Sequence, residues 1–473
     1  MASLSARALA LLIAGWRDLA QGPAYAALAD RIRLLILDGR VALGTRLPAE
    51  RELAAQLGLS RTTVSAAYAD LRESGHLDSI RGSGSIARLP RREGGSYDVL
   101  ATDALDFSKA MLPAHPAVAD AAQRAVAVLP SFLAESGFDP YGARIARQAV
   151  ADHYAARGLP TDPDEILITI GAQHAITLLT RTLLSRGDRA IIESPSYPHA
   201  VEAIRDAGAR LVTVPVTAEE GWDESALEQA FQRTSPVLAY LMPDNHNPTG
   251  ASMPARQRER VIRLAADQGT TLVIDETIGG LELDGQDRPA PFTSLGRSVM
   301  LGSFGKSVWG GLRIGWIRAD RELIQRVARQ RSTIDLGTPL LEQLILTELL
   351  RDFDRILADR RDYLRASRDH LVRLLAERMP EWHVPHVAGG ITTWVNLGLP
   401  ISSQLALAAR SEGLVIAAGS RFGVEGLFER FIRIPFTYPP DVLDRGVDAL
   451  ANAWRSVTRS PIQVTDRDYA QIA

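Results

Sequence analysis

The apolar positions near the N-terminus recur with the spacing of a helix. Four of them lie three or four residues apart, or directly adjacent, along the chain: Leu28, Ile32, Leu35 and Ile36. This spacing places their side chains on one face of a helix, and the pattern stops at Asp38 and Gly39, where a helix would end. An earlier apolar run at 8–16 is too short to span a bilayer and is cut off by Arg17 and Asp18. We therefore expect an extra helix there rather than a secretory signal.

Two further helices and a pair of strands follow. The pattern predicts a helix at about 49–56, a tight glycine-containing turn, and a second helix at about 61–74 that Ser60 can cap. Residues 76–80 and 85–88 flank an Arg-Gly-Ser-Gly turn and can pair as strands. Two helices joined by a short turn and followed by a hairpin are typical of a winged helix-turn-helix, which places its second helix in the major groove of DNA.

Beyond residue 104 the pattern changes to short apolar runs separated by helical segments. Seven of these runs are predicted to be strands: 165–170, 190–193, 211–216, 238–242, 271–275, 298–302 and 314–317. Strands that alternate with helices predict an α/β domain with a mostly parallel sheet. The ligands of such sheets bind beyond the carboxyl ends of the strands.

The last third of the chain predicts a smaller α/β domain. A long helical region runs from after Leu336 to Arg378, and a mixture of strands and one helix follows it at 391–397, 402–412, 415–419 and 431–436. The expected organisation has five parts: a winged helix-turn-helix domain with the extra helix at 1–88, a linker at 89–104, a large α/β domain at 105–365, a small α/β domain at 366–455 and a C-terminal tail at 456–473.

Lysine is rare in this chain. The 473 residues include 53 lysines and arginines, and only Lys109 and Lys306 are lysines. A lysine amine can lose its proton and attack a carbonyl, whereas a guanidinium group stays charged. Lys306 is therefore a candidate Schiff-base nucleophile, with an ordinary surface lysine as the alternative.

Cysteine is absent, which excludes disulfides, thiolate metal sites and a cysteine nucleophile. We expect a cytoplasmic protein without a metal site. Charge is uneven, because residues 1–92 hold 13 arginines and 8 acidic residues whereas the whole chain carries a net charge of −3. A basic N-terminal segment favours a nucleic-acid partner, although a solvated basic face would have the same composition.

The stretch LPAERELAAQLGLSRTTVSAAYADLRESG, with the helix before it and the hairpin after it, resembles the DNA-binding domain of GntR-type bacterial regulators over about residues 24–88. The resemblance implies a double-stranded DNA operator as partner. It implies seven DNA-binding residues: Arg51, Arg61, Thr62, Thr63, Arg81, Gly82 and Ser83. Arginine suits phosphates or guanine edges, and threonine suits phosphates or thymine methyl groups.

Several stretches give the second lysine a chemical context. GAQHA at 171–175 follows a strand and opens a helix, whose first amide groups attract phosphate. Tyr197 in SPSYPHA offers a flat aromatic face, and Asn247 in DNHNPTG offers a side-chain donor. Asp275 ends the strand TLVID, and Arg313 suits a bidentate phosphate clamp. Each piece alone has an ordinary structural explanation, but together they provide what pyridoxal phosphate needs from a protein.

The order and spacing of these residues resemble fold type I pyridoxal-phosphate enzymes, the aspartate aminotransferase superfamily, over roughly residues 105–455. The resemblance implies that Lys306 forms a Schiff base with the cofactor and that Asp275 keeps the pyridine nitrogen protonated. It also implies that Asn247 donates to the ring oxygen and that Tyr197 stacks on the ring. Five residues would surround the phosphate: Gly171, Ala172, Gln173, Ser303 and Arg313.

By the same resemblance, Arg433 in FIRIPF would bind the carboxylate of a substrate or effector, with a structural salt bridge as the alternative. Two departures from the family pattern are visible. The tyrosine usual two or three residues after the aspartate is replaced by Thr277 and Ile278, so that Thr277 would supply the hydroxyl, and Gly305 stands where serine is common before the lysine. Both departures speak against efficient turnover, not against cofactor binding.

A GntR-like winged helix, a linker and an aminotransferase-like domain in one chain resemble the MocR group of bacterial transcriptional regulators. The resemblance implies a pyridoxal-phosphate-dependent regulator that senses an amino compound, pairs as a head-to-tail homodimer and has no membrane partner. Two alternatives stay open: an active pyridoxal-phosphate-dependent aminotransferase, and a DNA binder whose large domain is a cofactor-free dimerisation scaffold.

Overall fold

The computed structural model describes residues 3–13, 23–37, 40–41, 44–80, 84–88, 104–286, 288–424 and 427–458. The predicted linker, apart from Ala104, lies outside these residues, as does the C-terminal tail beyond residue 458. The chain forms two compact units. The first contains Met1–Leu105, Ile401–Val415 and Ala449–Ala473, and the second contains Asp106–Pro400 and Ile416–Asp448.

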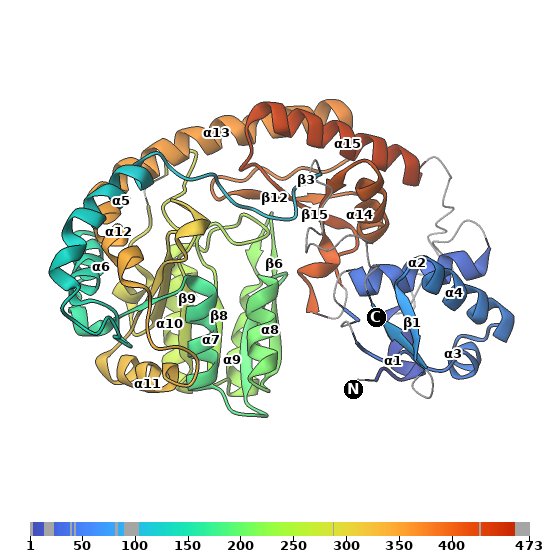
Figure 1. Cartoon of the computed structure of the whole chain (residues 1–473), viewed down its shortest axis with the longest axis horizontal. Coiled ribbons are helices and arrows are strands. Elements are labelled where there is room, and N and C mark those ends of the chain that lie inside the picture. The colour runs from blue at the N-terminus through green and yellow to red at the C-terminus, as the bar shows by residue number, and fades with distance from the viewer. Residues whose placement is uncertain are drawn as a thin grey trace. The chain divides into compact units, whose positions relative to one another are not determined.

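The N-terminal part of the first unit has four helices and a small sheet (Figure 1): α1 (Ala6–Leu12), α2 (Ala24–Leu37), α3 (Glu50–Leu57), α4 (Arg61–Glu73), β1 (Leu77–Ile80) and β2 (Gly84–Ala87). The two strands are antiparallel, with Leu77 opposite Ala87. The apolar residues predicted to line one face of α2 are all buried in the core of this part of the chain. The predicted extra helix is present as α1, and its Leu9 is buried in the same core.

The turn between α3 and α4 follows from its sequence. Gly58 ends α3 with a φ of 63°, a left-handed conformation that glycine adopts without a steric penalty. The hydroxyl of Ser60 accepts a hydrogen bond from the amide of Thr63 at 3.1 Å and so caps α4. The helix, turn and helix predicted from the sequence are therefore present with their predicted cap.

The large sheet of the second unit has eight strands. In spatial order they are β4 (Ile166–Thr169), β11 (Gly315–Arg318), β10 (Val299–Ser303), β9 (Thr271–Asp275), β8 (Leu238–Leu241), β5 (Arg189–Ser194), β6 (Arg210–Thr217) and β7 (Gly221–Trp222). Neighbouring strands from β10 to β6 are parallel. β11 is antiparallel to both of its neighbours, and β7 is antiparallel to β6. The prediction of a mostly parallel sheet is confirmed.

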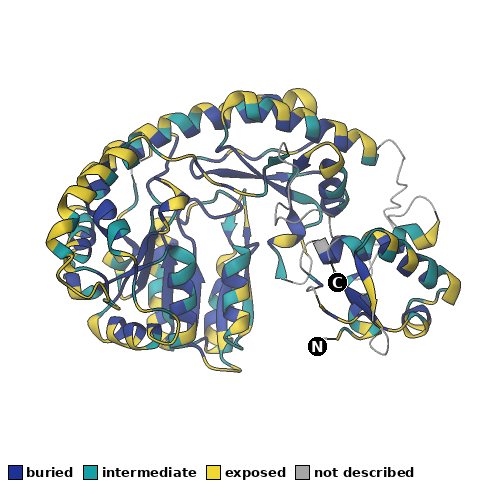
Figure 2. Cartoon of the chain, viewed as in Figure 1, coloured by how far each residue is buried: buried dark blue, intermediate teal, exposed yellow. Residues whose placement is uncertain are grey.

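Helices cover both faces of this sheet. Apolar side chains of α7 (Ala172–Leu183), α8 (Pro198–Asp206) and α11 (Arg321–Arg331) pack with Ile192, Tyr240 and Val273 on one face. Those of α9 (Glu224–Thr234) and α10 (Ala255–Gln268) pack with the neighbouring strand residues Ile191 and Leu272 on the other. Successive strand residues thus point to opposite faces, and both are buried (Figure 2). This double burial explains why the strands read as unbroken apolar runs.

The remaining helices of the large domain are α5 (Ala117–Val128), α6 (Arg144–Ala156), α12 (Leu340–Arg351) and α13 (Phe353–Arg378). The long helical region predicted after Leu336 is two helices, because the backbone leaves helical geometry at Asp352, where φ is −115° and ψ is 19°. Apolar residues recur on both sides of this break, so the spacing alone does not reveal it.

A second sheet of the same unit contains β12 (Thr392–Asn396), β15 (Phe431–Pro435) and β14 (Ala417–Ala418), all antiparallel. The predicted strand at 415–419 is divided between β13 (Leu414–Val415) and β14. The remaining elements are β3 (Leu105–Asp106), α14 (Ser402–Ser411) and α15 (Pro440–Thr458). Within the described residues, none of the helices combines the length and the apolar character that a bilayer span requires.

Candidate functional site

Lys306 lies in the turn after β10. Its amine donates a hydrogen bond to the carbonyl oxygen of Ala110 at 2.8 Å. Burial and, to a smaller extent, the charges of Arg433 and Arg313 lower the pKa of this amine from its ordinary value of 10.5 to about 8, although the charge of Asp275 opposes the shift. An amine that loses its proton near neutral pH is a competent nucleophile, which an ordinary surface lysine is not.

Asp275 ends β9 and is buried. Its carboxylate accepts hydrogen bonds from the amide of Thr277 at 2.9 Å and from the hydroxyl of Tyr240. Burial raises the pKa of Asp275, and these hydrogen bonds oppose the rise. Among the described residues Asp275 forms no ion pair, so its carboxylate is available to a ligand cation.

Tyr240 was not predicted as a site residue. It lies on β8 opposite Val273 of β9, so its side chain is on the same face as that of Asp275 two residues further on. The ring is fully buried, and burial together with Asp275 raises the pKa of the hydroxyl well above its ordinary value. The signal in the sequence was a tyrosine within the apolar run LAYLM.

Arg433 projects from β15 and is buried without an acidic partner in the described part of the chain. One terminal nitrogen donates to the side-chain oxygen of Asn247 at 3.3 Å, and the other donates to the carbonyl of Ser108. The guanidinium lies 4.8 Å from the centre of the Phe422 ring, and its Nε has no hydrogen-bond partner. Burial and the neighbouring charge of Arg421 lower the pKa of Arg433 to about 10. A buried cation without a carboxylate argues against the structural salt bridge and for an anionic ligand.

The residues expected around a phosphate converge at the start of α7. Gly171 precedes this helix with a φ of 82° and provides no side-chain cap, so the first amides stay available. Arg313 donates to the carbonyl of Ile170 at 3.2 Å, and a Cβ on Gly171 would lie 3.0 Å from its Nη2. Ser303 donates its hydroxyl to the carbonyl of Ile314 at 3.0 Å and accepts from the amide of Gly305.

The antiparallel direction of β11 explains why Arg313 belongs to this group. Gly315, the first residue of β11, is opposite Ser303, the last residue of β10. The beginning of β11 therefore lies at the same edge of the sheet as the carboxyl ends of the parallel strands. Arg313 lies two residues before β11 and adopts a left-handed φ of 47°, so the backbone turns sharply where its side chain leaves.

Tyr197 is the N-cap residue of α8 and is half-buried. Burial and the charge of Asp275 raise the pKa of its hydroxyl to about 12, whereas Arg433 and Arg313 oppose the rise. Tyr197 thus lies close to the carboxylate and to both arginines. The structure brings the predicted ring, phosphate and carboxylate residues into one site around Lys306.

Unpartnered buried polar atoms test whether pyridoxal phosphate fits this site. Within the described residues, such atoms include Gln173 Oε1 in the first turn of α7, Ser196 Oγ between β5 and α8, and Arg433 Nε on β15. Buried polar atoms in native proteins normally have partners, so these three indicate a polar ligand. A nucleophilic lysine, a buried carboxylate, an uncapped helix start and an arginine are the groups that the cofactor's aldehyde, pyridine nitrogen and phosphate require.

The predicted DNA-binding residues lie on α3 and α4 where the structure describes them. Arg51, Arg61 and Thr62 are exposed. The hydroxyls of Thr62 and Thr63 both lie 2.8 Å from that of Ser60, which orders them at the start of α4. Arg81, Gly82 and Ser83 lie outside the described residues.

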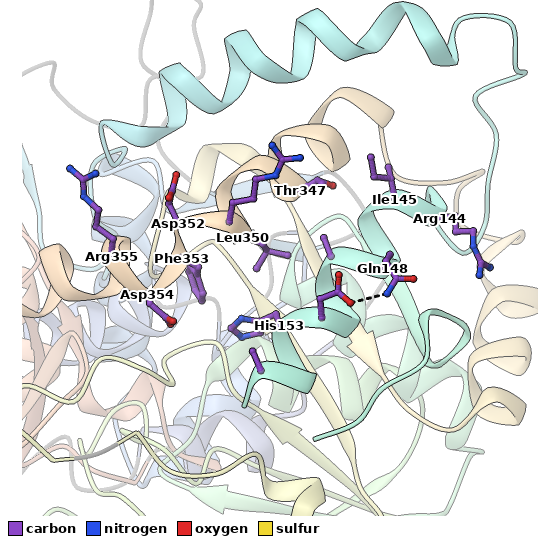
Figure 3. A pocket seen from close by; sticks show the side chains of 14 residues that line it. Arg144, Ile145, Gln148, His153, Thr347, Leu350, Asp352, Phe353, Asp354 and Arg355 are labelled. Atoms are coloured by element: carbon purple, nitrogen blue, oxygen red, sulfur yellow. Dashed lines mark hydrogen bonds between the residues drawn. The ribbon is translucent and has the colours of Figure 1, made fainter. Parts of the chain in front are cut away.

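A cavity of about 770 Å³ lies elsewhere, between α6 and the junction of α12 and α13 (Figure 3). Its lining mixes cations with acids, such as Arg355 with Asp352 and Asp354, and His153 lies at its wall. Burial lowers the pKa of His153 to about 3, so this imidazole stays neutral. None of the predicted site residues lines the cavity.

Comparison with known proteins agrees with this geometry. Residues 100–450 match the family "Aminotransferase class I and II", and residues 24–86 match "Bacterial regulatory proteins, gntR family". The 2-aminoadipate transaminase of Thermus thermophilus is 31% identical over 314 residues, which are 64% of this chain and 79% of the relative. The probable rhizopine catabolism regulatory protein MocR of Rhizobium meliloti is 26% identical over 94% of this chain and 96% of its own.

A solved structure shows the same likeness in three dimensions. LysN, the alpha-aminoadipate aminotransferase of Thermus thermophilus, superposes with a TM-score of 0.69 at 28% identity and covers 75% of this chain and 93% of its own. That structure is a complex with N-(5'-phosphopyridoxyl)-L-leucine. The uncovered quarter of this chain is long enough to include the gntR-type region.

Proposed function

We propose that this chain, which belongs to the aminotransferase class I and II family and carries a gntR-type DNA-binding region, is a transcriptional regulator of the MocR type that reads an amino compound at its pyridoxal phosphate site. Its winged helix binds a double-stranded DNA operator. DNA binding places it in the cytoplasm. Its large domain serves as the sensor.

The observation that carries the proposed sensor is that Lys306 and Arg433 lie near each other in one site. Lys306 offers an amine that is largely neutral above pH 8, and Arg433 offers a buried cation without a carboxylate in the described structure. Pyridoxal phosphate supplies an aldehyde that bonds reversibly to amines and absorbs visible light. An amino acid has one group for each of these two positions, an amine and a carboxylate.

The surrounding residues hold the ligands in place. Asn247 fixes the guanidinium of Arg433, and Ala110 fixes the free amine of Lys306. Asp275 receives the pyridine nitrogen, and Tyr240 orients that carboxylate. Arg313 and the start of α7 receive the phosphate. Because an amino compound could compete with the amine of Lys306 for the cofactor, the site would have two states, and a difference in DNA affinity between them would make it a sensor.

Exposed apolar side chains support a homodimer. Leu133, Phe138 and Leu336 are large apolar residues that are 69%, 71% and 62% exposed. A head-to-tail homodimer would cover such residues and present two winged helices to two DNA half-sites. Sedimentation equilibrium of the purified protein tests this part separately.

DNA binding during ligand titration tests the sensor. The protein, with and without pyridoxal phosphate, is titrated onto a labelled fragment of its own upstream DNA while amino acids are added, beginning with L-2-aminoadipate. An amino acid that shifts the visible spectrum is expected to shift the DNA affinity over the same concentration range. Identical DNA affinity under all conditions would contradict sensing, and a Lys306→Ala variant controls for binding of amino acids elsewhere.

A second candidate is an active aminotransferase. The identity to a named transaminase and the presence of Lys306, Asp275 and Arg433 favour it. Steady turnover with a keto-acid acceptor at metabolic rates would support catalysis as the main function. A slow single conversion of the cofactor would fit the regulator.

A further inference from the structure

Several arginines of the winged helix form ion pairs within this part of the chain. Arg33 pairs with Asp30 and Asp70, Arg72 pairs with Glu50, and Arg88 pairs with Asp78. In the part of this domain that follows α1, three exposed arginines form no ion pair within the described residues: Arg46, Arg51 and Arg61. The resemblance to GntR domains assigned the last two to DNA, and it assigned nothing to Arg46.

Arg46 lies on a third strand-like segment beside the wing. The amide of Leu47 donates to the carbonyl of Ser85 at 2.9 Å, and the amide of Ala87 donates to the carbonyl of Thr45 at 2.9 Å. These two hydrogen bonds place Arg46 directly opposite Ile86 of β2, so the two side chains are on the same face of the small sheet.

The guanidinium of Arg46 extends toward Gly84, the first residue of β2. Its Nε lies 3.2 Å from where a Cβ on Gly84 would be, and its Nη2 and Cζ lie 3.7 and 3.8 Å from that point. The absence of a side chain on Gly84 leaves room for the arginine. The charged end of Arg46 thus lies at the base of the wing.

Nearby acids do not neutralise this charge. Asp78 lies across β2 from Arg46, opposite Ile86, and its carboxylate is 3.2 Å from Arg88. Glu50, the first residue of α3, lies four residues after Arg46 in the chain, and its carboxylate is 3.0 Å from Arg72. An exposed guanidinium whose acidic neighbours are already paired suits a phosphate of the DNA backbone.

We infer that Arg46 binds a phosphate of the DNA backbone, as a DNA contact additional to those predicted on α3, on α4 and at residues 81–83. The inference rests on the proposed DNA binding. A purely structural role is the competing explanation, because the stem of Arg46 also covers Ile86, which is buried.

Two substitutions separate charge from packing. Arg46→Met keeps an apolar stem over Ile86 and removes the charge, whereas Arg46→Lys keeps the charge. Arg88→Met is the matched control: it also removes one positive charge from the same sheet, but from a side chain that is paired with Asp78. An effect of net charge alone predicts equal losses of DNA affinity for Arg46→Met and Arg88→Met.

The measurement is fluorescence anisotropy of the full-length protein with pyridoxal phosphate on its own upstream fragment and on unrelated DNA, over a range of salt concentrations. We expect Arg46→Met to weaken binding roughly tenfold at 0.1 M salt on both DNAs, and to reduce the slope of log affinity against log salt by about one. Arg46→Lys should stay within about threefold of the parent, and Arg88→Met should keep the parent slope.

Three results would overturn the inference. Arg46→Met could bind like the parent, it could lose no more than Arg88→Met, or Arg46→Lys could lose as much as Arg46→Met, which would show a packing role. Absence of DNA binding by the parent protein would instead overturn the proposed function itself. Thermal unfolding of each variant by circular dichroism verifies that the winged helix is folded at the assay temperature.

Discussion

The hydroxyl of Tyr240 donates a hydrogen bond to the carboxylate of Asp275, from the strand next to the one that Asp275 ends. Burial raises the pKa of Asp275, and this hydrogen bond favours its charged form. The tyrosine therefore helps to keep a buried carboxylate ionised for the pyridine nitrogen.

Tyr240→Phe should weaken pyridoxal phosphate binding by about tenfold, because a hydrogen bond to a charged group contributes about 1.5 kcal/mol or more. Spectrophotometric titration with the cofactor measures this change in affinity. Tyr68→Phe is the matched control, since Tyr68 is a buried tyrosine of the winged helix whose hydroxyl donates to the carbonyl of Pro48 at 3.0 Å. Equal cofactor affinity in Tyr240→Phe and the parent would contradict the role given to Tyr240.

The rate at which pyridoxal phosphate bonds to Lys306 should rise with pH, with a midpoint near the pKa of about 8. The reason is that only the neutral amine reacts, and a lowered pKa makes that form available at lower pH. Arg433→Met removes a nearby positive charge, so it should move the midpoint upward. Stopped-flow absorbance from pH 6.5 to 10 measures it, and a midpoint at the ordinary lysine value of 10.5 in the parent would contradict the account.

Arg360 on α13 fixes the turn that carries Lys306. It donates to the carbonyls of Ser307 at 2.9 Å, Val308 at 2.7 Å and Pro113 at 2.6 Å. Arg360→Met leaves these carbonyls without the donor, so it should lower the free energy of unfolding by about 3 kcal/mol and weaken the cofactor band. Urea titration measures the free energy of unfolding of both variants. Arg361→Met, which removes one hydrogen bond of 3.3 Å to the carbonyl of Gly280, should lower it by only about 1 kcal/mol. Equal losses of unfolding free energy in the two variants would show that the three hydrogen bonds of Arg360 stabilise the fold no more than the single hydrogen bond of Arg361.

Gly171→Ala should reduce cofactor affinity roughly tenfold, about 1.4 kcal/mol. The added Cβ would crowd Arg313 at 3.0 Å, and a φ of 82° strains any residue with a side chain. Gly158→Ala separates the two effects, because Gly158 has a φ of 80° but no atom within 4 Å of an added Cβ. Both variants should lose about 1 kcal/mol of stability, and only Gly171→Ala should lose cofactor affinity. A loss of affinity in both would assign the effect to backbone strain.

Strands buried on both faces were predictable because they read as unbroken apolar runs. β9 at Thr271–Asp275 has the predicted bounds, and the other predicted strands of the large sheet differ by one residue at one or both ends. The break at Asp352 was not predictable, since the residues on both sides of it favour a helix. Helix ends that depend on tertiary packing leave no mark in the local spacing.

The candidate site also contains residues that the sequence predicted and residues that it did not. Lys306, Asp275 and Asn247 were predictable because Asp275 ends a strand and the other two follow one, where an α/β sheet places its ligands. Tyr240 was missed because a tyrosine inside a strand resembles core, and its role depends on the neighbouring strand. Arg313 was predicted as a phosphate ligand, but only the antiparallel direction of β11 explains how it reaches that edge.

The decisive measurement is the visible absorption spectrum with pyridoxal phosphate, recorded for the parent protein and for Lys306→Ala. We expect a visible band in the parent that is absent in Lys306→Ala and that changes when an amino-acid effector is added. The same spectrum for both proteins, or no visible band in either, would contradict the sensor and leave a winged-helix DNA binder whose large domain has another purpose.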